Sequence, residues 1–230
     1  MRYRIQFSRL AEARFVSHLD TMKAVERAMR RARIPIAFSE GFNPHPKFSF
    51  GSALAVGVTS EKEYLDLELQ QEWEPARLLK TLSANMPGGY RLSEVKVLAP
   101  EAPAAMSIIN QADYLVRFKP SRTVTQEQLE QLVTDFLARP EIIVEKNTKK
   151  GKRQADLRPG IFTLSAQLQN PYIILRMHLQ SGSTGNIRPE DVVSALSAQG
   201  NLDVDVITAQ IHRLGLYVSK NDQLLTPMNI

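Results

Sequence analysis

The chain has 230 residues with a net charge of +5, a hydrophobic content of 43% and a charged content of 23%, ordinary values for a globular protein. It contains no cysteine, which excludes disulfides, thiolate zinc sites, cysteine nucleophiles and a cysteine-ligated iron–sulfur cluster within it. No apolar run reaches the roughly 18–20 residues of a membrane span, and the N-terminus lacks the apolar core of a signal peptide, so we expect a soluble, cytoplasmic protein without membrane contact.

The first half of the chain alternates strand and helix patterns. Alternating apolar side chains predict strands over residues 2–8, 34–39, 62–69 and 90–99. Ser17 is a suitable N-cap for a helix that runs to Arg33 and ends before Pro35. A second helix is predicted from Pro75 to about Met86, where a Pro-Gly-Gly sequence stops it.

The second half repeats this order, with one additional strand. Its predicted helices cover 125–138 and 188–199, and its strands cover 112–119, 141–146, 160–168, 172–179 and 205–218. The segment 99–106, APEAPAAM, has no periodicity and is the expected domain boundary. We therefore predict an α+β fold of two tandem ferredoxin-like βαββαβ modules, an N-terminal one over 1–100 and a C-terminal one over 106–230 with a basic hairpin arm.

Acidic residues and histidines give no sign of a metal or catalytic centre. The four histidines are scattered, and no two have the spacing of metal ligands on one helix face, so we expect no bound metal. Asp66 and Glu68 fall on one side of an alternating strand and are expected to be exposed.

The positive charge is concentrated in two segments. On the helix from Ser17, a narrow sector of the circumference holds four basic residues, Lys23, Arg27, Arg30 and Arg31. They form either a phosphate-binding ridge or an ordinary solvated face. The second segment is a tip between two strands, where Gly151 permits a turn and the basic residues are Lys149, Lys150, Lys152 and Arg153. This tip predicts an anion-binding arm. Nearby, Arg158 either reaches a ligand or pairs with Asp156.

The segment SEGFNPHPKFSF, residues 39–50, is stiffened by Pro44 and Pro46, which favour extended conformations in the residues before them. We predict a preformed recognition loop in which Phe42 stacks on a base. We predict that His45 and Lys47 of this loop contact a nucleobase or a phosphate.

The alternative is a proline-stapled turn whose aromatic residues belong to the core. Phe48 and Phe50 alternate with polar residues and suit that role.

Several motifs resemble those of a bacterial family, the radical-SAM-associated proteins. They are FVSHLD, ERAMRRARIPIAFSEGFNPHPKFSF and GVTSEKEYLDLEL in the first half and KKGKRQADLRPGI in the second. Members of that family occur as separate chains or fused behind a radical SAM domain, and their genes often lie near those of ribosomal proteins and of an RNase E/G-type ribonuclease. The resemblance implies an RNA partner and a radical SAM protein partner, and it assigns no catalytic residue.

The absence of cysteine limits what the resemblance implies. A radical SAM enzyme needs three cysteines for its cluster, and this chain has none. We therefore expect no cofactor here, with the iron–sulfur cluster and S-adenosylmethionine held by the partner protein.

These observations favour a non-catalytic protein that binds RNA or presents a substrate to a radical SAM enzyme, linked to RNA or ribosome metabolism. One alternative is a metal-independent endoribonuclease, similar in architecture to CRISPR RNA-processing proteins, in which His45 and Lys47 are catalytic. The other is a protein–protein adaptor whose basic surface docks on the radical SAM enzyme. No pattern in the chain predicts its oligomeric state.

Overall fold

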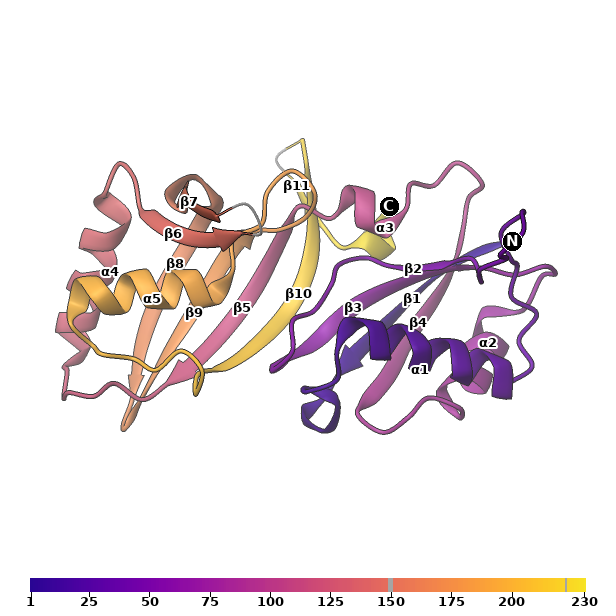
Figure 1. Cartoon of the computed structure of the whole chain (residues 1–230), viewed down its shortest axis with the longest axis horizontal. Helices are drawn as coiled ribbons and strands as arrows, with labels where there is room; N and C mark the ends of the chain where they lie inside the picture. Colours follow the sequence, from indigo (N-terminus) through magenta and orange to yellow (C-terminus); the bar gives the residue numbers. More distant parts are fainter. Residues whose placement is uncertain (149–150, 222) are drawn as a thin grey trace. The chain divides into compact units, whose positions relative to one another are not determined.

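The structure, a computed structural model, describes residues 1–148, 151–221 and 223–230. It is a mixed α+β fold with antiparallel strand pairing (Figure 1). The chain forms two compact units: unit 1 comprises Met1–Asn110 and Arg213–Ile230, and unit 2 comprises Gln111–His212. None of the helices in these described ranges is long and apolar enough to cross a membrane.

Unit 1 contains the elements β1 (Arg2–Arg9), η1 (Ala11–Ala13), α1 (His18–Arg31), β2 (Phe48–Phe50), β3 (Val58–Glu68), α2 (Pro75–Ser83), β4 (Tyr90–Leu98), α3 (Ala105–Ile108), most of β10 (Gln210–Lys220), β11 (Gln223–Leu225) and η3 (Pro227–Asn229). Its strands lie in the order β4-β1-β3-β10, with β2 on β3 and β11 on β10. The predicted N-cap is confirmed, since the Ser17 hydroxyl accepts a hydrogen bond from the Asp20 amide at 3.1 Å.

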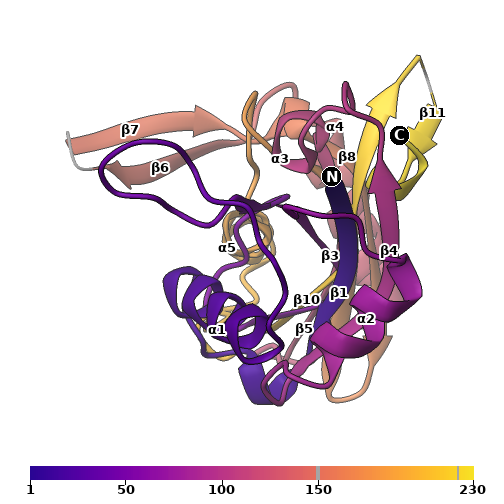
Figure 2. The same ribbon diagram turned by 90° about the vertical axis from the view of Figure 1, so that its right-hand side faces the viewer.

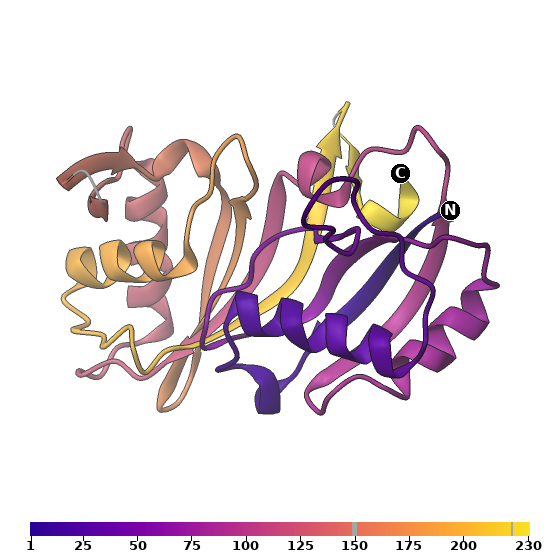
Figure 3. The same cartoon turned by 45° about the vertical axis from the view of Figure 1, so that its right-hand side comes forward.

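The core of unit 1 forms where α1 and α2 cover one face of its strands (Figure 3). Tyr3, Ile5 and Phe7 alternate along β1 as predicted, and all three are buried. They pack with apolar residues of both helices, among them Met29 and Leu78.

Unit 2 contains β5 (Gln111–Phe118), α4 (Gln126–Ala138), β6 (Ile143–Thr148), β7 (Gly151–Asp156), η2 (Arg158–Gly160), β8 (Ile161–Gln169), β9 (Tyr172–Gln180), α5 (Pro189–Gly200) and the first residues of β10. Its strands β5, β9 and β8 are neighbours and antiparallel, while β6 and β7 form a separate two-stranded ladder. Both α4 and α5 bury apolar stripes, as their periodicity predicts.

Several predicted elements differ from the structure, among them the strand predicted over 62–69, which begins at Val58. The strand expected over 34–39 is reduced to two isolated bridges, Ile36–Leu69 and Phe38–Pro46, in a segment where Pro35 cannot donate to a ladder. The last strand begins at Gln210 rather than 205, and residues 151–156 form β7 instead of remaining a turn.

The two units also differ from the modules expected over 1–100 and 106–230. The structural division falls after Asn110, because the 99–106 segment is tied to unit 1. The Arg2 guanidinium donates to the Ala102 carbonyl at 2.6 Å, and that of Arg4 donates to the Pro103 carbonyl at 2.8 Å. The C-terminal segment is held by the same side chain, since Arg4 also donates to the Pro227 carbonyl at 2.7 Å.

Candidate nucleic-acid interface

The segment between α1 and β2 forms a closed loop that projects from unit 1 (Figure 2). At its base the Lys47 amide donates to the Ala37 carbonyl at 2.8 Å. Further out the Ser39 amide donates to the His45 carbonyl at 2.8 Å, and the His45 amide returns a bond to Ser39 Oγ at 2.9 Å. Gly41 has a φ of +113°, which suits glycine, at the turn. Main-chain bonds therefore set the shape of this loop.

The aromatic side chains of this segment divide between solvent and core. Phe42 lies at the tip and is fully exposed, with a relative accessibility of 107%. Phe48 and Phe50 are partly buried against the core of unit 1, as the alternative interpretation expected of them. Phe38, in the same loop, is 46% exposed, so Phe42 is the most exposed phenylalanine that this loop offers to a ligand.

The described contacts do not bring His45 and Lys47 together as a catalytic pair. His45 is exposed, and its main chain makes the loop bonds above. The Lys47 amine lies 3.5 Å from a carboxylate oxygen of Glu68 on β3. This ion pair directs Lys47 toward the strand next to it.

The four basic residues of α1 are exposed, and each has a local partner. Lys23 lies 4.0 Å from Asp20, and Arg30 lies 2.8 Å from Glu26. Arg27 donates to the Lys23 carbonyl, and Arg31 donates to the Asn85 carbonyl. Exposed pairs of this kind contribute about 1 kcal/mol or less, so a phosphate can displace the acidic partners at small cost.

The strands β6 and β7 form the predicted basic arm, a projecting hairpin (Figure 2). Lys152 and Arg153 are exposed on it, and Lys152 pairs with Glu145 at 2.8 Å. Lys146, which pairs with Arg153 in the ladder, lies 2.9 Å from Asp191 of α5. The other two predicted residues, Lys149 and Lys150, lie outside the described residues.

The guanidinium of Arg158 is engaged with the main chain of unit 2. Its Nε donates to the Leu137 carbonyl at 2.9 Å, and Nη1 donates to the Ile161 carbonyl at 3.2 Å. Asp156 accepts a bond from the Arg158 amide at 2.9 Å rather than from its guanidinium. These contacts fix the turn before β8.

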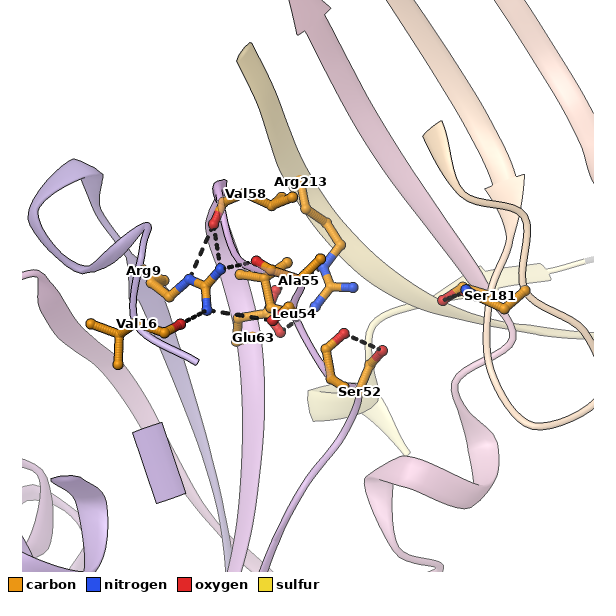
Figure 4. Close-up of polar contacts among 11 residues, drawn as sticks. Arg9, Val16, Ser52, Leu54, Ala55, Val58, Glu63, Ser181 and Arg213 are labelled. Carbon is orange, nitrogen blue, oxygen red and sulfur yellow. Dashed lines mark hydrogen bonds and ion pairs between the residues drawn. The ribbon is translucent and has the colours of Figure 1, made fainter. Parts of the chain in front are cut away.

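Sequence reasoning missed the buried ion pairs of unit 1. Asp66, expected on an exposed face, is buried and accepts two hydrogen bonds from Arg4, at 2.7 and 2.9 Å. On the same strand, Glu63 accepts bonds of 2.8 and 2.6 Å from Arg213 of β10 (Figure 4). The expectation for Asp66 was wrong because a second layer, the 99–106 segment and the C-terminal residues, lies over that side of the sheet.

A third buried arginine, Arg9, holds two loops together. Figure 4 shows its guanidinium surrounded by main-chain carbonyls. It donates to Val58 at 3.1 and 2.6 Å, to Val16 at 3.3 Å, and also to Ala55. Burial lowers the pKa of Arg9 below its ordinary value, while Tyr90 and Glu63 act in the opposite direction.

Replacing Arg9 by lysine is expected to lower the free energy of unfolding by about 1–3 kcal/mol, although the charge is kept. A single ammonium cannot reach the carbonyls of Val16, Ala55 and Val58 together, so buried acceptors lose their donors. Urea denaturation of Arg9→Lys measures this loss. An Arg91→Lys variant, on the exposed side of β4, serves as the control and should change stability by less than about 0.5 kcal/mol.

His18, at the start of α1, packs rather than standing free. Its ring lies edge-on to Phe50 with the centroids 5.3 Å apart. It lines a small pocket together with Arg9, Thr21 and Ser52. Among the residues that the structure describes, no group of three His, Asp or Glu side chains is placed to hold a metal ion.

Solved structures resemble the chain only distantly. A chain of the Cbf5-Nop10-Gar1 complex is 13% identical with a TM-score of 0.43, and a chain of the archaeal box H/ACA sRNP Nop10-Cbf5 complex is 10% identical with a TM-score of 0.38. The matches cover 84% of this chain in both cases, but only 44% and 42% of those chains, so this chain spans less than half their length. An unknown protein from Galdieria sulphuraria, 11% identical with a TM-score of 0.26, is matched over 93% of this chain and 96% of its own. Likenesses this low assign no function.

Sequence comparison gives the family. No curated protein matches the chain. The model of a family described as an uncharacterized protein conserved in bacteria, DUF2344, matches residues 2–189, and the chain therefore belongs to this bacterial family.

Proposed function

We propose that the protein is a non-catalytic RNA-binding or substrate-presenting partner of a radical SAM enzyme. The observation that carries RNA binding is Phe42, a fully exposed ring at the tip of a loop closed by main-chain bonds. An exposed phenylalanine lacks the stabilisation of about 1.5–3 kcal/mol that burial of its side chain would contribute to folding. Stacking on an unpaired base returns about 1–3 kcal/mol, and a preformed loop lowers the entropy cost of binding.

The basic arm of unit 2 and the α1 face of unit 1 are proposed to bind phosphate groups. Lys152 and Arg153 are exposed on the arm, and the ion pair of Lys152 with Glu145 is exposed too. Such a pair is exchangeable, so the lysine is available to a stronger anion. Loss of RNA affinity with rising salt is therefore expected.

The partnership with a radical SAM enzyme rests on the motif resemblance. In this proposal the iron–sulfur cluster and S-adenosylmethionine belong to the partner, since the chain has no cysteine. We also propose that unit 1 is a ferredoxin-like βαββαβ module. In support, β1 lies between β4 and β3, and β2 pairs with β3 in the βαββαβ order.

Phe42→Ala is expected to weaken RNA binding about 5- to 100-fold, because the stacking contribution is lost. The measurement is crosslinking and sequencing of RNA recovered with the protein from cells, followed by affinity for the recovered RNA in vitro. Phe15→Ala is the matched control, since Phe15 is 71% exposed in the same unit but lies outside the loop. It should leave affinity unchanged.

A variant with residues 149, 150, 152 and 153 all changed to alanine tests the arm. A discrete RNA that is lost in this variant supports the proposal. If no RNA is enriched and a radical SAM protein co-purifies instead, the adaptor alternative replaces it. If the protein cleaves RNA and His45→Ala abolishes cleavage while binding persists, it is an endoribonuclease.

A further inference from the structure

The strands β5, β9 and β8 of unit 2 lie side by side (Figure 1), and the burial of their side chains gives the sheet two faces of different character. Along β5 and β9 every second side chain is buried in the core, including Val116, Leu175 and Met177. The alternate side chains are half-buried or exposed, and they define the second face. This polar face consists of Gln111, Asp113, Leu115 and Arg117 on β5, and Tyr172, Ile174, Arg176 and His178 on β9.

Phe162 of β8 belongs to the same face. Its ring centroid lies 5.5 Å from that of His178, and the ring is 46% exposed. Phe162 lies at a register shift between β8 and β9, which changes the direction of its side chain. His178 is bonded at Nδ1 to Asp113 and at Nε2 to Gln111. Its ring is thus fixed in place beside Phe162.

The polar face is positively charged. The three strands contain one acidic residue, Asp113, and that carboxylate is already bonded to His178. They also contain Arg117 and Arg176. Arg176 is exposed, and within the described part of the chain it forms no ion pair. Asp113, which lies diagonally across from Arg176 on this face, is engaged by His178, and an exposed arginine without an ion pair suits an anionic ligand.

The second aromatic ring of the polar face is held by an arginine. The Arg117 guanidinium carbon lies 3.3 Å from the centre of the Tyr172 ring, and its Nη1 donates to Gln210 at 3.2 Å. Tyr172 and the His178–Phe162 contact are six residues apart along β9, about 20 Å. Two aromatic platforms therefore flank the two arginines.

We infer that the polar face of unit 2 binds single-stranded RNA, with bases stacked on Tyr172 and Phe162 and phosphates bound by Arg117 and Arg176. This inference rests on the proposed RNA function and adds a surface distinct from the loop and the arm. The arginines select a polyanion, and the aromatic rings select unpaired bases, whose faces a duplex conceals. Gln167 and Gln169, exposed on β8, offer amides to the base edges.

The test is fluorescence polarisation with the full chain and a labelled uridine oligonucleotide of about ten nucleotides, a length within the range of single-strand sites. Tyr172→Ala is expected to weaken binding about 5- to 100-fold, while Tyr172→Phe, which keeps the ring, stays within about twofold of wild type. Arg176→Ala should reduce affinity and lower the salt slope by about one. Arg188→Ala removes an exposed arginine elsewhere in unit 2 and should change neither.

The outcomes separate this inference from the proposed function. If the wild-type chain binds no RNA, the proposed function fails and the inference fails with it. If wild type binds and Phe42→Ala weakens binding, while Tyr172→Ala and Arg176→Ala do not, only the inference is overturned. Equal affinity for duplex RNA, or for polyglutamate with the same dependence on Tyr172, also overturns it. If Tyr172→Ala lowers the melting temperature, the RNA affinity of Arg176→Ala, a change at an exposed position, decides the outcome.

Discussion

Replacing Arg4 by alanine is expected to lower the free energy of unfolding by about 3–5 kcal/mol, because it leaves a buried carboxylate without its cation. Arg4 is completely buried, and its ion pair with Asp66 at 2.7 Å is almost so. The same guanidinium satisfies the carbonyls of Pro103 and Pro227. The substitution thus removes an ion pair and uncovers two further acceptors.

Urea denaturation followed by tryptophan fluorescence measures this effect directly. The single tryptophan, Trp73, lies in unit 1, where its carbonyl accepts a bond from Tyr3 at 2.8 Å. Arg30→Ala is the matched control, since it breaks an ion pair of 2.8 Å that is exposed on α1, and it should cost less than about 1 kcal/mol. Equal effects of the two substitutions would contradict the buried pair.

Glu63→Ala is expected to have a similar effect, again about 3–5 kcal/mol. Glu63 and Arg213 are both nearly inaccessible and share two short hydrogen bonds between β3 and β10. The substitution removes the carboxylate while the guanidinium stays in the interior. Charge burial of this kind costs more than the loss of an exposed pair.

A double-mutant cycle distinguishes pairing from mere packing. Glu63→Leu combined with Arg213→Met should be less destabilising than the sum of the two single changes, because neither charge is then buried alone. Additive effects would show that the two side chains do not interact. Glu26→Ala, on the exposed face of α1, provides the low-cost reference.

Local patterns predicted most of the helices and strands of this chain. Apolar alternation marked β1 and β9, and Ser17 and Thr125 marked the helix starts, since each of these signals depends only on neighbouring residues. The buried pairs depend on strand register. Arg4 stands opposite Asp66 only because β1 and β3 pair antiparallel, 62 residues apart in sequence.

The candidate interface was predictable to a similar extent. The prolines predicted a stiff loop; main-chain hydrogen bonds close this loop and Phe42 is exposed, while stacking of Phe42 on a base stays a prediction. The alternation of Phe48 and Phe50 with polar residues already indicated a core role for these two rings, and both pack against the core of unit 1. The polar face of unit 2 was missed entirely. Its residues come from three strands, and only the sheet brings them onto one surface.

The discontinuity of unit 1 has a consequence for how the protein forms during synthesis. Residues Gln111–His212 are made as one stretch, so unit 2 is complete on the ribosome before Arg213 and Pro227 emerge. Until then, Glu63 lacks the guanidinium of Arg213, and Arg4 lacks the Pro227 carbonyl. The unit that is synthesised first is therefore completed last, and translation that stops short of residue 213 leaves Glu63 without its ion-pair partner.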